Sequence, residues 1–199
     1  WFFLGLMYGF FYMSRYNLGA VQSAVAEQFG WSHDDYGTIT SAGLATYGCA
    51  VFLNGPLADR IGGKRAILIG AAGAAFFNLL FGLCHLLIVK PAVMAGGQVI
   101  SQAQLGAGLN STSVIAMFAV LWACNHYFQS FGALSIVKIN AAWFRVTERG
   151  KFAGIFGIMI QLGRTLAMVL LPALLLIVPW QYAFFVPALL LTVIWGFCY

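Results

Sequence analysis

Charged residues are scarce in this chain. Only 8% of its 199 residues are Asp, Glu, Lys or Arg, whereas 62% are hydrophobic. A water-soluble domain needs a mixed charged surface, which this composition cannot supply. The lipid bilayer is therefore the expected solvent, and the length allows six apolar helices of about 20 residues each with short connections.

Other absences narrow the fold and the chemistry. The alternating segments of about ten residues that build an outer-membrane barrel are missing, and no cleavable leader is predicted ahead of the first apolar span. No nucleophile is accompanied by a base at matching depth, so no enzyme is predicted. No metal or soluble cofactor is predicted either, because the cysteines are scattered without CxxC pairing. They are Cys49, Cys84, Cys124 and Cys198.

The apolar pattern predicts an all-α membrane protein with six transmembrane helices. An open sheet cannot satisfy its backbone hydrogen bonds in lipid, so each apolar span is expected to be helical. The chain opens on Trp1 and stops on Tyr199 without a polar tail, which indicates a piece of a longer protein. The helices are expected over about 1–26, 36–58, 66–88, 112–138, 151–172 and 180–199.

The basic residues are distributed in a way that indicates membrane topology. The net charge of +5 is split among turns instead of being gathered on one helix face, so no nucleic-acid partner is predicted. The connections expected on the opposite side carry only Lys90. By the positive-inside bias, the basic connections and both chain ends are cytoplasmic. These connections hold Arg60, Lys64 and Arg65 after the second span, and Arg145, Arg149 and Lys151 after the fourth.

An arginine lies near the middle of the first span, within the stretch FFYMSRYNLGA. A charge at that depth costs about 3 kcal/mol on insertion scales and is usually met by a partner or a wet cavity. All five acidic residues lie at or beyond the span ends, so no carboxylate is available to Arg15. We therefore expect an anionic ligand, because a guanidinium suits bidentate recognition of carboxylate or phosphate. Helical spacing puts Arg15 on one polar, small-residue face with Tyr8, Tyr12, Gly19 and Gln22.

Further polar side chains occur in the fourth and fifth spans. Arg164 follows Gln161 by three residues, and Gln129 shares a helix face with Asn125. Such amides can also act as contacts between packed helices, and an arginine can snorkel to the membrane interface. Together, however, Arg15 and Arg164 are two intramembrane cations without an intramembrane anion, which predicts an electropositive site.

A short connection between the second and third spans reads GPLADRIGGKRA, residues 55–66. Gly55 permits close helix approach, Asp59 can accept hydrogen bonds at the adjoining helix end, and two adjacent glycines make a tight turn. This spacing resembles the signature loop between helices two and three of the major facilitator superfamily of transporters. The resemblance implies a gating loop that latches one state of the transport cycle. Its residues are Gly55, Asp59, Arg60, Gly62, Lys64 and Arg65.

Other motifs narrow the resemblance to the organophosphate:phosphate antiporters of that superfamily. They occur in the family's order: SRYNL at 14–18, TYG at 46–48, YFQSFG at 127–132 and ERGKFAGIFG at 148–157. The chain departs from the glycerol-3-phosphate exchangers of this family at three pocket positions, which are Tyr16, Val51 and Ile160 here. These departures leave the identity of the substrate open within the anion class.

The resemblance implies an amino-terminal six-helix bundle that a carboxy-terminal half-bundle completes. The implied function is exchange of an organic anion, a phosphate ester, for inorganic phosphate by alternating access in the bacterial inner membrane. A sugar-phosphate sensor of the same fold and a carboxylate transporter of another branch are the alternatives. The expected substrate-binding residues are Arg15, Tyr8, Tyr12, Tyr47, Gln129, Gln161 and Arg164.

Overall fold

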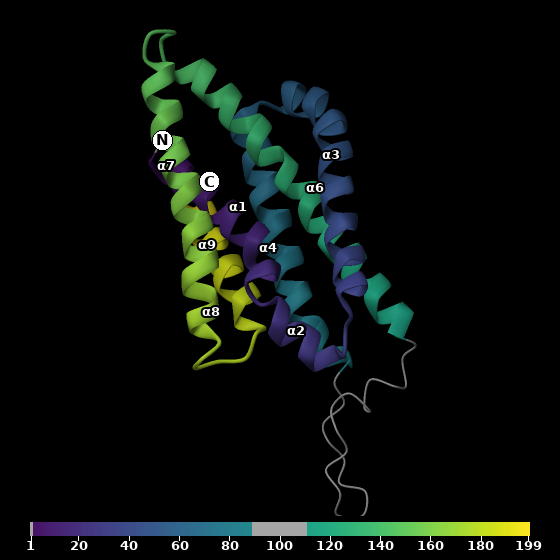
Figure 1. Cartoon of the computed structure of the whole chain (residues 1–199). Coiled ribbons are helices and arrows are strands. Elements are labelled where there is room, and N and C mark those ends of the chain that lie inside the picture. The colour runs from purple at the N-terminus through teal and green to yellow at the C-terminus, as the bar shows by residue number, and fades with distance from the viewer. Residues whose placement is uncertain (1, 89–110) are drawn as a thin grey trace, which may run out of the picture.

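The structure, a computed structural model, describes residues 2–88 and 111–199, and within these ranges all of its regular secondary structure is helical (Figure 1). The all-α prediction is therefore confirmed for this part of the chain, while Lys90 lies outside it. The elements are α1 (Phe2–Ala20), α2 (Gln22–Phe29), α3 (His33–Ile61), α4 (Gly63–Ile88), α6 (Ser111–Trp143), α7 (Arg149–Thr165), the π-helical turn η2 (Leu166–Leu170), α8 (Leu171–Leu174) and α9 (Tyr182–Cys198).

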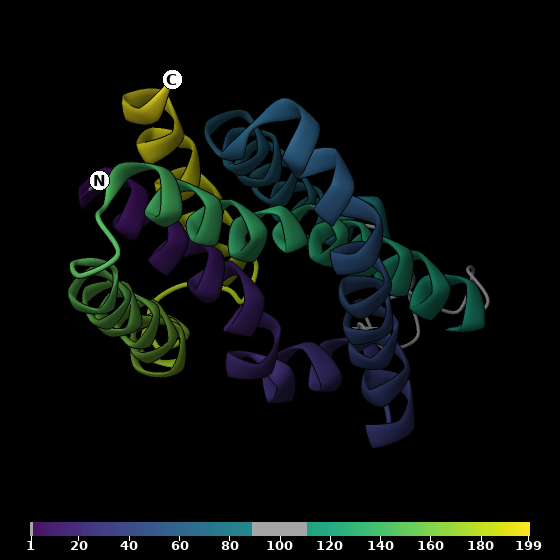
Figure 2. The ribbon, with the colours of Figure 1, turned by 90° about the horizontal axis from the view of Figure 1, so that it is seen from above.

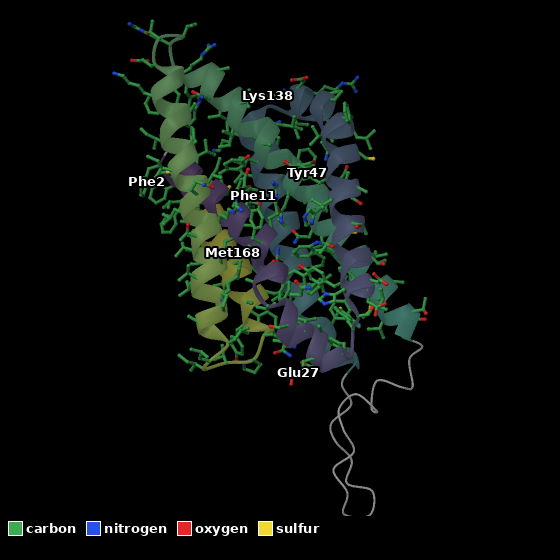
Figure 3. The ribbon with its side chains drawn as sticks, in the orientation of Figure 1. Phe2, Phe11, Glu27, Tyr47, Lys138 and Met168 are labelled. Atoms are coloured by element: carbon green, nitrogen blue, oxygen red, sulfur yellow. The ribbon has the colours of Figure 1, made fainter. Side chains whose placement is uncertain are left out.

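The long helices form a bundle in which α1 contacts α4, α6, α7 and α9. Helix α6 packs against both α3 and α4, and α9 packs against α4 and α1. Viewed from above, α1 lies between α6 and α7 (Figure 2). The α3–α4 turn and the α6–α7 connection lie at one end of the bundle (Figure 1). Lys138 marks this end and Glu27 the opposite one (Figure 3).

Three stretches of the described helices are long and apolar enough to cross a membrane. They are Gly63–Cys84, Thr112–Trp143 and Arg149–Leu174, whereas the apolar helix Tyr182–Cys198 is shorter. Large apolar side chains remain on the outside of the bundle, among them Phe52 (83% exposed). Such a surface would be unfavourable in water and is typical of a protein that faces lipid or a partner.

The first helix is shorter than the expected span of 1–26. Helix α1 ends at Ala20, Val21 adopts a turn with φ −116° and ψ 15°, and α2 then begins. The side-chain oxygen of Asn17 accepts a hydrogen bond from the N–H of Leu18 at 2.9 Å, a local contact that competes with regular helix bonding. The β-branched Val21 adds stiffness at the break. The predicted polar face therefore ends early, because Gln22 belongs to a different helix.

The fifth span also differs from the expected continuous helix over 151–172. The regular part of α7 ends at Thr165, and the chain continues through the π turn η2 into the short α8. In a π turn the backbone bonds reach from residue i to residue i+5, so the side chains that follow are rotated relative to an ideal helix. Hydrophobic periodicity alone could not reveal this change.

Glycines bring the backbones of α1 and α7 into direct contact. A Cβ placed on Gly163 would lie 1.9 Å from the carbonyl oxygen of Gly9, and one placed on Gly5 would meet the Met159 side chain. Gly5 and Gly9 form a G-x-x-x-G pair on α1, the pattern that allows close approach of membrane helices. The small residues of α1 therefore position α7 beside it.

The start of α3 carries a capping box. The Ser32 N–H donates to Oδ2 of Asp35 at 2.9 Å, and the Ser32 hydroxyl donates to the same oxygen at 2.8 Å. The Asp35 N–H in turn donates to Oγ of Ser32 at 3.2 Å. The bonds from Ser32, the backbone one foremost, lower the pKa of Asp35 below its ordinary value of 3.8. The ionised carboxylate is thus the form that caps the helix.

This capping box predicts that the stability of the first turn of α3 depends on pH. Because the pKa of Asp35 is lower in the folded chain, its stabilising contribution is present above the unfolded pKa and is lost as pH falls through the folded value. We expect hydrogen exchange over residues 33–36, corrected for intrinsic rates, to rise below about pH 4. Asp35→Asn should abolish the pH-dependent increase, whereas Asp34→Asn should retain it. An equal response in both variants would contradict the assignment.

Candidate functional site

The guanidinium of Arg15 lies over two tyrosine rings. Its Cζ is 5.0 Å from the centre of the Tyr12 ring, one turn earlier on α1, and 4.3 Å from that of Tyr47 on α3. The position of Tyr47 between α3 and α6 is visible in Figure 3. The faces of the rings carry partial negative charge, so both contacts are cation–π interactions, worth about 0.5–2 kcal/mol each depending on desolvation. Two helices therefore hold this cation in place.

A hydrogen-bonded chain continues from Arg15 into α6. Nε of Arg15 donates to Oε1 of Gln129 at 2.9 Å, and Nε2 of Gln129 donates to Oδ1 of Asn125 at 3.0 Å. Gln129 is fully buried. Within this hydrogen-bonded chain, two buried donors remain without a partner in the described structure, Nη2 of Arg15 and Nδ2 of Asn125. A ligand that satisfies both must offer acceptor atoms.

No carboxylate neutralises Arg15. Among residues 2–88 and 111–199, which include all five acidic residues, the recorded ion pair joins Lys138 to Asp59 at the end of the bundle. Arg15 is thus a cation whose described partners are neutral: an amide and two aromatic rings. These partners reduce the free-energy cost of burying the charge, but none of them carries a negative charge that would neutralise it.

Tyr8 extends the aromatic group along α1. Its ring meets the Tyr12 ring edge-on, with centroids 5.5 Å apart, and a Cβ on Gly132 would lie 3.1 Å from the Tyr8 ring. Tyr8 is 6% exposed, so the absence of a side chain at Gly132 gives it room against α6. Tyr8, Tyr12, Tyr47, Gln129 and Arg15 are therefore brought together by α1, α3 and α6.

His126 borders this group next to Tyr47. The two ring centroids are 6.5 Å apart, and Nδ1 of His126 lies 3.0 Å from the carbonyl oxygen of Trp122, one turn earlier on α6. A Cβ on Gly43 of α3 would lie 3.0 Å from the same Nδ1. This close packing between α3 and α6 fixes the orientation of the imidazole beside Tyr47.

Gln161 and Arg164 lie apart from the Arg15 group. Both are exposed on α7, whereas Arg15 is partly buried. Cζ of Arg164 lies 5.2 Å from the centre of the Tyr16 ring on α1, and Tyr16 stacks on Tyr12 with centroids 6.2 Å apart. Arg164 therefore reaches Arg15 only through two intervening tyrosine rings. Gln161 makes no recorded hydrogen bond among the described residues.

Two members of the group were not among the predicted site residues. Tyr16 appeared in the sequence as a departure from a family pattern, and Asn125 as a neighbour of Gln129 on one helix face. Their spacing contains a signal, because each lies four residues from a predicted member, Tyr12 or Gln129, and residues i and i+4 meet on a helix. That spacing indicates contact but does not reveal the hydrogen-bond direction.

The gating-loop residues lie at the end of α3, the turn after it and the start of α4. Gly62 has φ +84°, a conformation that glycine adopts without strain, and it links the two helices as a single residue. Lys64 donates to the backbone oxygen of Tyr199 at 3.3 Å. Arg60 and Arg65 are exposed.

Two expectations about this loop differ from the structure. Asp59 pairs with Lys138 of α6, so its carboxylate acts in an ion pair rather than as a helix-end acceptor. A Cβ on Gly55 would meet nothing within 4 Å, so no close helix contact occurs there in the described structure. The helix also continues through Pro56 to Ile61. The charged part of the motif therefore links α3 to α6, whereas its first glycine has free space around it.

The chain matches a known family over most of its length. A family model described as Major Facilitator Superfamily covers residues 4–199. The chain is 26% identical over 176 residues to the membrane sensor protein UhpC of Escherichia coli (strain K12), covering 88% of this chain and 34% of UhpC. It is 24% identical over 185 residues to a probable hexose phosphate transport protein of Chlamydia trachomatis, covering 93% and 34%.

A further relative is the glycerol-3-phosphate transporter of Bacillus subtilis (strain 168). Its identity is 26% over 188 residues, covering 93% of this chain and 37% of the relative. The chain thus spans about a third of the length of the curated relatives it matches, 34% of the first ones. No solved structure matches it significantly. The family and these relatives confirm the resemblance that the motifs indicated.

Proposed function

The chain belongs to the major facilitator superfamily, and on that premise we propose that it acts in a secondary active transporter exchanging a phosphate ester for inorganic phosphate. Transporters of this superfamily are not enzymes, and we place this chain in the bilayer as an integral membrane protein. The proposal rests foremost on Nη2 of Arg15, a buried donor without a partner on a cation that no carboxylate neutralises. A phosphate supplies both the charge and the acceptor atoms that this group lacks.

The names of the relatives support the choice of a phosphate ester. Two are named as hexose phosphate and glycerol-3-phosphate transporters. In this proposal Arg15 binds the phosphate group, with Tyr8, Tyr12, Tyr47 and Gln129 around it. The donor set also suits a carboxylate, since both anions present paired oxygen acceptors to a guanidinium.

The proposed architecture has six transmembrane helices in one half of the transporter. The six would comprise α1, α3, α4, α6, α7 continued through α8, and α9. A second, carboxy-terminal half-bundle would complete the site from the opposite side, as in transporters whose substrate binds between two repeats near the midplane. Both chain ends would face the cytoplasm of a bacterial inner membrane, on the side of the basic connections.

The proposed cycle is alternating access driven by the bound anion. The substrate neutralises Arg15 and contacts the second half-bundle, so the two halves can close only around a loaded site. The loop from Gly55 to Arg65 would latch one state through charged contacts at the helix ends, such as the pair between Asp59 and Lys138. Exchange then needs no ATP, because one anion carries the protein from the first open state to the second and the other anion carries it back.

Counterflow in proteoliposomes tests this function. We expect vesicles containing the full-length protein and loaded with phosphate to take up labelled organophosphate faster than vesicles without internal phosphate. Uptake that does not depend on internal phosphate would contradict exchange. Counterflow with dicarboxylates alone would identify a carboxylate transporter instead.

A sensor is the second candidate, because one relative is named a membrane sensor protein. A sensor would bind the same anion through Arg15 but would not release it on the other side of the membrane. Saturable organophosphate binding without counterflow is the result that would favour this function over transport.

A further inference from the structure

We propose that Arg164 and Tyr16 form a second anion-binding subsite in addition to Arg15, so that the preferred substrate carries two separate anionic groups. This inference rests on the proposed function, because it assigns the phosphate group to Arg15. It adds the chemical class of the substrate: a phosphate ester that also bears a carboxylate or a second phosphate. The subsite is built by α1 and α7.

The first observation is the position of Arg164 along α7. It lies well inside the apolar stretch Arg149–Leu174, which is long enough to cross a membrane. A cation at such a depth is unfavourable unless a partner or a wet cavity accepts it. Among residues 2–88 and 111–199, Arg164 has no recorded hydrogen bond or ion pair, and its recorded partner is the Tyr16 ring. Its charge is therefore available to a ligand.

The second observation is the stacked row that connects the two cations. Arg164 lies over Tyr16, Tyr16 stacks on Tyr12, and Arg15 lies over Tyr12. Each guanidinium thus occupies a different ring, and the two ring centres are 6.2 Å apart. The two cations therefore lie at the two ends of this stacked row, so one anionic group cannot contact both of them in the same way.

The third observation is the rigid contact between the helices that carry the cations. Arg164 directly follows Gly163, whose Cα position allows no Cβ because the Gly9 carbonyl oxygen is too close. Two residues after Arg164 the π turn η2 begins, and such turns are frequent at functional sites. A snorkelling arginine would instead extend along its own helix toward the membrane surface. The contact with Tyr16 directs Arg164 toward α1.

Because the two cations are separate, the site can distinguish phosphate esters with one anionic group from those with two. A monophosphate ester with a neutral tail satisfies Arg15 and leaves Arg164 without an anion. A phosphate ester with a second anionic group compensates both charges, and the planar guanidinium binds either a carboxylate or a phosphate. The predicted selectivity is therefore for esters with two separate anionic groups over esters with a single phosphate group.

Binding to the purified full-length protein in detergent, measured by isothermal titration calorimetry, tests this subsite with two matched ligand pairs. The first pair is glycerol 3-phosphate and 3-phosphoglycerate, which differ by a carboxylate; the second is fructose 6-phosphate and fructose 1,6-bisphosphate. We expect at least one ligand with two anionic groups to bind about tenfold more tightly than its single-phosphate counterpart, as for one added charge-assisted contact. Which pair responds distinguishes a carboxylate from a phosphate at Arg164.

Variants separate this proposal from the function on which it rests. Arg164→Gln should weaken the ligand with two anionic groups about tenfold and so remove the preference within the responding pair, whereas Arg15→Gln should weaken both ligands of a pair. Lys151→Gln removes an equal charge from an exposed position of α7 and should preserve the preference. No preference in the wild type, or equal weakening of both ligands by Arg164→Gln, would overturn the second subsite. Undiminished binding in Arg15→Gln would instead overturn the function proposed for Arg15.

Discussion

Arg15→Lys is expected to reduce organophosphate exchange by about 10- to 100-fold. Lysine keeps the positive charge but loses the planar fork, so it cannot bind a phosphate through two parallel hydrogen bonds. It also loses the Nε–H that donates to Gln129 and the position of the guanidinium over the rings of Tyr12 and Tyr47. Hydrogen bonds to charged groups contribute about 1.5–3 kcal/mol each, and every 1.4 kcal/mol corresponds to about a factor of ten.

Initial rates of counterflow at several substrate concentrations measure this effect. Arg145→Lys is the matched control, because it makes the same exchange on an exposed connection at the end of the bundle and should keep the wild-type rate. Thermal unfolding of each variant in detergent separates lost binding from lost folding. Wild-type exchange in Arg15→Lys would remove Arg15 from the proposed anion site.

Gly163→Ala is expected to destabilise the bundle by about 3 kcal/mol, near the upper end of the usual cost of overpacking. The added Cβ would lie 1.9 Å from the Gly9 carbonyl oxygen and 2.6 Å from its carbonyl carbon. Backbone atoms cannot rotate away as a side chain can, so α7 must move from α1. We expect a clear fall in the midpoint of thermal unfolding, followed by circular dichroism in detergent.

Gly157→Ala provides the matched control on the same helix. A Cβ at Gly157 meets nothing within 4 Å, so the substitution adds no clash. Alanine is favoured over glycine in a helix by up to about 1 kcal/mol, and Gly157→Ala should therefore be neutral or stabilising. The two variants are expected to change stability in opposite directions. A similar small change in both would show that the α1–α7 contact is looser than described.

Composition and periodicity could predict the all-helical fold because they depend on short-range physics. An apolar span in lipid must be helical, and apolar runs mark such spans without any knowledge of packing. The breaks in the helices depend on tertiary contacts instead. The turn at Val21 involves a local bond of Asn17, whose amide also donates to Asn78 on α4 and to the Ala183 carbonyl on α9. No single-helix pattern contains those partners.

In the candidate site, too, the features within one helix could be predicted from the sequence and the contacts between helices could not. The absence of an acid at the depth of Arg15 can be read from the positions of the acidic residues, and helical spacing places Tyr8 and Tyr12 beside it. The bond to Gln129 requires knowing how α1 and α6 face each other. The exposure of Arg164 also depends on packing, since a stripe of polar residues does not reveal which way its helix is rotated.

The crossing of Gly9 and Gly163 has a consequence for altering selectivity. At that point the two backbones touch, and main-chain atoms have no alternative rotamers through which the offset of the helices could be adjusted. A ligand with a longer or shorter distance between its anionic groups must therefore be accommodated by the side chains of Arg15 and Arg164. Exchanging guanidinium for ammonium at position 164 changes that reach, whereas sliding α7 along α1 does not offer a route.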